Sequence, residues 1–154
     1  MTTGLRHAAA LAALIACATP AHAGWETTHW DMPLEEAVAA LDGAERNTPA
    51  VTEMVVYDGV TYAPLLKQAR AVEGLDGEVT FLFDADATLQ FVTFSPSDAV
   101  ECDRLVDALT ERHGATDATG FGSTAIYNWV EGEDIIRLTS SLEAAICNLS
   151  YGPA

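Results

Sequence analysis

The chain has 154 residues and carries 23 acidic against 7 basic side chains, a formal charge of −16. A hydrophobic fraction of 49% is enough to build a core, so length and composition predict one acidic globular domain and argue against intrinsic disorder. The excess of carboxylates argues against nucleic acid and against an anionic membrane surface as partners, because both require clustered Lys and Arg.

Residues 1–23 have the three parts of a signal peptide. Arg6 supplies the positive charge, residues 8–16 are apolar, and Ala21-His22-Ala23 fits the small-residue pattern that a signal peptidase recognises. We therefore expect cleavage between Ala23 and Gly24, which leaves residues 24–154 as the mature domain. No later apolar run approaches ~18 residues, so no transmembrane segment is expected.

A possible lipoprotein signal overlaps the predicted signal peptide. The stretch Leu14-Ile15-Ala16-Cys17 resembles the lipobox of bacterial lipoproteins, in which the cysteine becomes the acylated N-terminus. Cleavage at Gly24 predicts a periplasmic or secreted protein, whereas lipidation of Cys17 predicts a lipid-anchored envelope protein. With either export signal, the domain is expected to fold outside the cytoplasm.

The first element predicted in the mature chain is a short helix that begins near Pro33. Proline suits the first turn, Glu35 and Glu36 favour the positive end of the helix dipole, and Gly43 is a natural stop. Apolar residues then recur at the spacing of one helical face, at Leu34, Ala37, Val38 and Leu41.

Strand patterns follow this helix. They cover residues 51–57, 65–72, 79–83 and 89–94, with turns at 58–59, 74–77 and 84–87. A second helix is predicted to start at Ser95-Pro96-Ser97-Asp98 and to end at Gly114. Its apolar stripe is Cys102, Leu105, Val106 and Leu109, and strands at 125–130, 135–139 and 144–149 complete the chain.

This order predicts an α+β fold, with an antiparallel sheet and two helices on one face, because strands that follow one another closely pair locally. Helix followed by three strands occurs twice, which suggests a tandem repeat. The element order resembles the helix–sheet modules of outer-membrane-assembly lipoproteins and of the β-lactamase inhibitory protein. A resemblance in element order implies no function.

The opening of the mature chain carries a nearer resemblance. The stretch Trp25-x-Thr27-x-x-Trp30-Asp31-Met32-Pro33-x-Glu35-Glu36 is similar to the start of small uncharacterised exported bacterial proteins that read W-x-M-S/T-x-E-E. Their F-x-F-D hairpin and C-x-L-x-Y strand correspond to Phe81-Leu82-Phe83-Asp84 and Cys147-Asn148-Leu149-Ser150-Tyr151. Pro33 stands where those proteins usually have a Ser or Thr cap.

Two cysteines remain in the mature chain, Cys102 and Cys147. An even pair in an exported protein predicts a structural disulfide, here closing a loop of about 45 residues. Glu101 and Asp103 flank Cys102 and would raise a thiol pKa, which argues against a reactive thiolate.

Catalytic and metal motifs are weak. The G-x-S-x-G elbow is absent, and His113 is better placed to interact with a helix C-terminus than to act as a base. Asp84-Ala85-Asp86-Ala87-Thr88 imitates the start of a calcium loop, but Leu89 replaces the required glycine and Ser95 the required glutamate. A turn is the favoured interpretation, and no metal or cofactor is assigned.

These observations favour a non-catalytic envelope protein that binds a protein partner or a small ligand, for example an inhibitor or adaptor for a basic extracytoplasmic protein. The alternative is a small carboxylate-dependent or calcium-binding hydrolase. The candidate partner surface consists of Trp25, Trp30, Glu131, Glu133 and Asp134. Core packing is the competing interpretation for the tryptophans.

Overall fold

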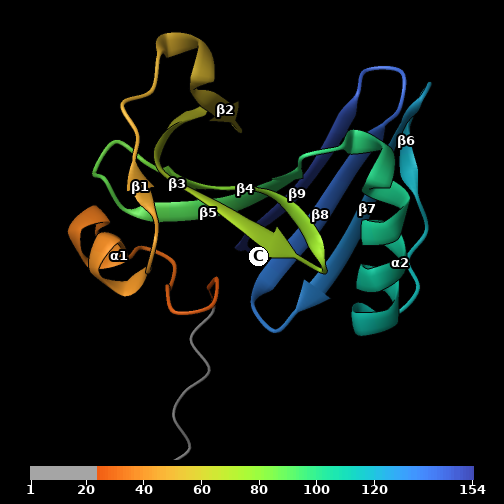
Figure 1. Cartoon of the computed structure of the whole chain (residues 1–154), viewed down its shortest axis with the longest axis horizontal. Helices are drawn as coiled ribbons and strands as arrows, with labels where there is room; N and C mark the ends of the chain where they lie inside the picture. Colours follow the sequence, from red (N-terminus) through yellow and green to blue (C-terminus); the bar gives the residue numbers. More distant parts are fainter. Residues whose placement is uncertain (1–23) are drawn as a thin grey trace, which may run out of the picture.

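The computed structural model describes residues 24–154 (Figure 1). The predicted signal peptide, including Ala23 and the lipobox cysteine Cys17, lies outside the described residues. Cleavage and lipidation therefore stay predictions.

One antiparallel sheet dominates the described part of the chain. Its strands are β1 (Glu45–Arg46), β2 (Val55–Tyr57), β3 (Val60–Val72), β4 (Leu75–Phe83), β5 (Leu89–Pro96), β6 (Thr119–Phe121), β7 (Thr124–Glu131), β8 (Asp134–Ser141) and β9 (Ile146–Pro153). They are ordered β1-β3-β4-β5-β9-β8-β7-β6, and β2 pairs with β3 outside this path. The predicted α+β fold is confirmed in its broad form, although the chain is richer in strand than expected.

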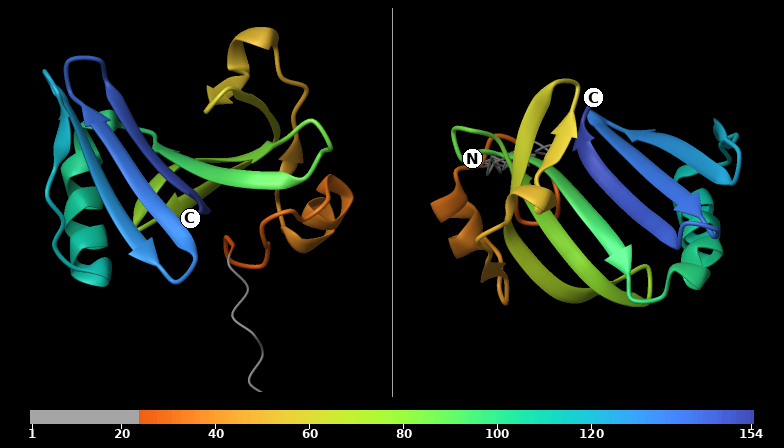
Figure 2. Two further views of the ribbon diagram at one scale, coloured as in Figure 1. Left: turned by 180° about the vertical axis from the view of Figure 1, so that it is seen from behind. Right: turned by 90° about the horizontal axis from the view of Figure 1, so that it is seen from above.

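Two α-helices accompany the sheet, α1 (Leu34–Ala40) and α2 (Cys102–His113). Two 3₁₀ turns, Val51–Glu53 and Ala99–Glu101, precede β2 and α2 respectively. Figures 1 and 2 show α1 beside the β3–β5 end of the sheet and α2 beside the β7–β8 end. Both helices contribute buried residues to one hydrophobic core.

The sheet consists of two three-stranded meanders joined at their last strands. β3-β4-β5 follows α1 and β7-β8-β9 follows α2, and the meanders meet where β5 pairs with β9. Three residue pairs form this junction: Val92 with Tyr151, Thr93 with Ser150, and Phe94 with Leu149. The order of elements is thus repeated, and a tandem relationship between the two halves stays a prediction.

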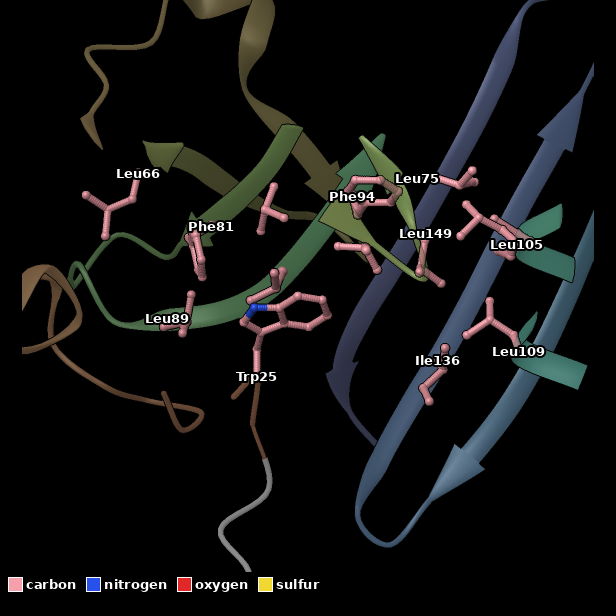
Figure 3. Packing of buried hydrophobic residues seen from close by; sticks show 14 of the residues in the cluster. Trp25, Leu66, Leu75, Phe81, Leu89, Phe94, Leu105, Leu109, Ile136 and Leu149 are labelled. Carbon is pink, nitrogen blue, oxygen red and sulfur yellow. The ribbon is translucent and has the colours of Figure 1, made fainter. Parts of the chain in front are cut away.

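The core lies between the helices and one face of the sheet. Figure 3 shows Phe81, Phe94, Leu149 and Leu105 among the buried side chains that meet there. Because side chains alternate along a strand, burying this set leaves the intervening residues of β4, β5, β8 and β9 on the opposite face, which neither α-helix covers. This second face is called the helix-free face below.

Several elements differ from the sequence prediction: β1 and β6 were not expected, β3 begins at Val60 instead of residue 65, and the last strand is Ile146–Pro153 instead of residues 144–149. Ser95 and Pro96 continue β5, and the next helical turn begins at Asp98, whose side chain accepts a hydrogen bond from the Val100 N–H. Residues 51–53 form a 3₁₀ turn instead of strand. Gly77 lies inside β4 and not in a turn, paired with Arg70 and Pro96. A Cβ there would come within 2.3 Å of the Ser95 carbonyl oxygen and 2.5 Å of the Phe94 ring, so this strand position requires glycine.

Candidate functional site

A groove of about 280 Å³ lies on the helix-free face of the sheet. It crosses β4, β5, β9 and β8 and runs beneath β2. Its lining residues are Val55, Tyr57, Leu82, Phe91, Thr93, Ile135, Arg137, Thr139, Asn148, Ser150, Gly152 and Pro153. A neighbouring hollow of about 340 Å³ shares Val55, Leu82, Thr93 and Asn148 with it, so the two form one continuous depression.

The β2–β3 hairpin forms one wall of this groove. Figure 2 (right) looks down on the hairpin and the strands that run beside it. Tyr57 and Tyr62 each place the edge of a ring against Phe91, with centroid distances of 5.7 and 5.0 Å. Phe91 in turn lies over Gly152, where a Cβ would come within 2.4 Å of its ring. The bare backbone at Gly152 therefore allows an aromatic floor under the hairpin.

Strand register divides the floor of the groove into two parallel rows. The apolar row runs across the sheet through Pro64, Leu82, Phe91, Gly152, Ile135 and Val130. The polar row lies two residues away along each strand, or three on β3, where a bulge adds a residue between Pro64 and Leu66. It runs through Lys67, Thr80, Thr93, Ser150, Arg137 and Asn128. Because a strand rises about 3.4 Å per residue, the two rows lie about 7 Å apart.

The two ends of the polar row differ electrostatically. Lys67 donates a hydrogen bond to Glu53 over 3.2 Å and lies 3.7 Å from Glu78, so two carboxylates neutralise it. The Ala50 N–H, followed by Lys67, holds the pKa of Glu53 below its usual value. At the other end, the Nε of Arg137 donates to the Asn128 Oδ1 over 2.8 Å, and no carboxylate within residues 24–154 pairs with this guanidinium.

The five residues of the predicted partner surface differ in their exposure. Trp25 is only 7% exposed and places its ring against Tyr151, with the centroids 4.6 Å apart, so it is a core residue. The Trp30 Nε1–H donates to the Asp134 Oδ1 over 2.6 Å. These contacts join the opening segment to β9 and β8, whereas Glu131 and Glu133 lie on an exposed turn.

A polar hollow of about 320 Å³ lies beside this opening segment, lined by Gly24, Trp25, Glu73, Arg112, Asp134 and Tyr151 among others. Its charged groups pair with one another: the Arg112 guanidinium lies 2.6 Å from Glu73, and Asp134 accepts from Gly24 and Trp30. Burial, with a further contribution from Glu73, raises the pKa of the Tyr151 phenol. The hollow therefore serves the packing of the N-terminal segment.

Asp84 occupies the tight turn that the sequence analysis favoured over a calcium loop. Its carboxylate accepts hydrogen bonds from the backbone N–H groups of Asp86 and Thr88 and from the Thr88 hydroxyl. Burial raises the pKa of this carboxyl, but these hydrogen bonds outweigh it, so the pKa lies below its usual value. Among residues 24–154, no three His, Cys, Asp or Glu side chains are grouped to hold a metal ion.

Cys102 and Cys147 form the predicted disulfide, with their Cα atoms 5.6 Å apart. Both are buried, at the start of α2 and in β9. Such a pair is typical of proteins that fold in an oxidising compartment. His113, at the end of α2, is largely buried, and its Nδ1 lies 3.6 Å from Glu131.

Comparison with known proteins adds little to this description. No family model matches the chain, and no curated protein matches it. Among solved structures, a DUF4309 family protein from Bacillus subtilis matches with 10% sequence identity and a TM-score of 0.45. The match covers 78% of this chain and 77% of that protein. So distant a likeness carries no argument about function.

None of the described helices is long and apolar enough to cross a membrane.

The sequence analysis missed the groove entirely. Its lining residues are mostly neutral, come from five strands, and match no catalytic or ligand-binding motif. The available signal was the alternation within each strand. In β5, for example, Phe91 and Thr93 alternate with the core residues Val92 and Phe94. Combining those alternations into rows requires the strand register, which the sequence alone does not supply.

Proposed function

We propose that this protein is a non-catalytic binding protein of the cell envelope, and that its binding site is the groove on the helix-free face. The observation that carries the proposal is that apolar side chains on the floor and wall of the groove are exposed to solvent. Val55 and Tyr57 remain 41% and 51% exposed at the wall, whereas the fully buried aromatic side chains Phe81, Phe83 and Phe94 lie on the opposite face. Exposed apolar surface of this kind marks a site for a ligand or partner.

The dimensions favour a small ligand over a protein partner. At about 280 Å³ the groove lies near the lower end of the range for small-molecule pockets. The hairpin overhangs the floor, so a flat protein surface would contact the hairpin without reaching Phe91. A basic protein partner at the exposed Glu131–Glu133 turn is the competing occupant, and it would leave the groove empty.

The groove lining also favours binding over catalysis. It contains neither a carboxylate nor a histidine or cysteine, the side chains that most often transfer protons or attack substrates. Glu53, which lines the neighbouring hollow of the same depression, is held in an ion pair with Lys67. A carboxylate-dependent hydrolase therefore finds no support from the residues of this site.

The test uses N-phenyl-1-naphthylamine, a neutral apolar dye that fluoresces when it is bound. We expect the wild-type domain to bind it saturably and Tyr57→Ala to weaken binding by about tenfold, because roughly 1.4 kcal/mol of apolar burial is lost. Val56→Ala is the matched control. Val56 lies next to Tyr57 in β2, but its side chain points to the strand face opposite the groove and is 67% exposed.

Dye binding that Tyr57→Ala weakens and Val56→Ala leaves within twofold supports the proposal. Absence of saturable binding to the wild-type protein, or equal losses in the two variants, contradicts it. Both residues are exposed, so circular dichroism should show the wild-type fold in either variant.

A further inference from the structure

We propose that the ligand of this groove is a compact amphipathic molecule with a single carboxylate, and that Arg137 holds this carboxylate. The inference rests on the proposed function, since it names the chemical class that the same groove takes. It is based on the lack of a carboxylate partner for Arg137 among the described residues and on the position of Arg137 relative to the apolar row.

Arg137 is exceptional among the basic residues of this acidic chain. Within residues 24–154, the other five Lys and Arg side chains each pair with a carboxylate: Arg46 with Glu35, Lys67 with Glu53, Arg70 with Glu26, Arg104 with Glu101, and Arg112 with Glu73. Arg137 alone in this part of the chain has no such partner. With 23 acidic residues available, the one unpaired guanidinium lies in the groove.

The guanidinium is nevertheless held in place. Its Nε donates to the Asn128 Oδ1 on the adjacent strand, which fixes the direction of the planar group across the polar row. The two terminal nitrogens have no hydrogen-bond acceptor among the described residues. An arginine cannot lose its proton, and its paired terminal N–H groups match the two oxygens of a carboxylate. A half-buried guanidinium that is fixed in orientation and has unpaired terminal N–H groups is suited to bind an anion.

The neighbouring residues define the rest of the ligand. Next to Arg137 in the polar row, Ser150 and Thr93 offer hydroxyl groups to a polar end. The apolar row, with Phe91 at its centre, lies about 7 Å away and beneath the hairpin. A ligand that fits both rows has an aliphatic or aromatic body that begins within a few bonds of its charge.

Charge limits the ligand to one carboxylate. The chain carries a formal charge of −16, so its long-range potential repels anions and repels a dianion more strongly than a monoanion. One guanidinium neutralises one carboxylate. Any second ionised group would remain uncompensated beside the excess negative charge.

The experiment measures displacement of the bound dye by decanoate and by methyl decanoate, its neutral ester. We expect decanoate to bind the wild-type domain about tenfold more tightly, since an ionic hydrogen-bonded contact contributes about 1.4 kcal/mol or more. Arg137→Gln should remove this preference and leave the affinities of the dye and the ester within twofold. Arg104→Gln is the matched control, because it removes the same charge from the exposed surface of α2.

The outcomes separate the two proposals. Equal affinities of the wild-type domain for decanoate and methyl decanoate, or an unchanged preference in Arg137→Gln, overturn the assignment of Arg137 while dye binding still supports the groove. Failure of the wild-type domain to bind the dye overturns the proposed function itself. The comparison of acid with ester uses the wild-type protein, so it remains decisive even when Arg137→Gln fails to fold.

Discussion

Replacing Cys102 and Cys147 together by alanine is expected to lower the free energy of unfolding by about 2–5 kcal/mol. The two residues are 45 positions apart, so the bond removes considerable freedom from the unfolded chain. It also joins the first turn of α2 to β9, the strand through which the second meander pairs with β5. We therefore expect this loss of stability to spread through the whole C-terminal half.

Urea denaturation of wild-type protein and double variant, followed by circular dichroism, measures the difference. Wild-type protein treated with a reductant is the control and should approach the double variant, because it loses the same cross-link without losing buried side-chain atoms. Two free thiols in the native, oxidised protein would contradict the assignment. Equal unfolding midpoints for the wild-type and double-variant proteins would contradict the energetic account.

Asp134→Ala is expected to lower the free energy of unfolding by about 2 kcal/mol, because hydrogen bonds to a charged group each contribute about 1.5–3 kcal/mol and this site is half-buried. One carboxylate oxygen accepts from the Trp30 indole over 2.6 Å and the other from the Gly24 N–H over 3.3 Å. Removing them releases the opening segment from β8. The ring of Trp25 would then lose its fixed position against Tyr151.

The same urea titration compares this variant with Glu133→Ala, which removes an equal charge from the adjacent exposed turn position and should leave stability unchanged within about 0.5 kcal/mol. Equal effects of the two substitutions would show that charge, and not the hydrogen bonds, explains the result. Tryptophan fluorescence provides a second measurement, since it should shift towards the red only in Asp134→Ala.

Local patterns predicted the helices well, because helical periodicity and terminal residues depend on residues close together in the sequence. The disulfide was predicted from the cysteine count, since Cys102 and Cys147 are 45 positions apart. The stripe of Cys102, Leu105 and Leu109 is buried as expected, and α2 ends before Gly114. Pro33 directly precedes α1, also as expected. In each case the helical period or a terminal residue determines which side chains meet the core.

Features that depend on contacts between distant strands could not be predicted. Gly77 was predicted to lie in a turn, yet it pairs with Pro96 within the sheet, and the nearby Phe94 ring leaves no room for a Cβ at this position. Trp30 and Asp134 are 104 positions apart, and nothing in either local sequence indicates their hydrogen bond. The sequence does not distinguish Arg137 from the other basic residues. Its lack of a carboxylate partner is apparent only from the ion pairs of the described chain.

The central claim is that the helix-free face binds a small apolar ligand, and a titration of the ¹⁵N-labelled domain with decanoate tests it most directly. The account predicts that the largest amide shifts fall in β5, β8, β9 and the β2–β3 hairpin, centred near Phe91 and Arg137, while α1 and α2 change little. Shifts concentrated around Gly24 and Asp134, or on the helices, or the absence of saturable shifts, would contradict it.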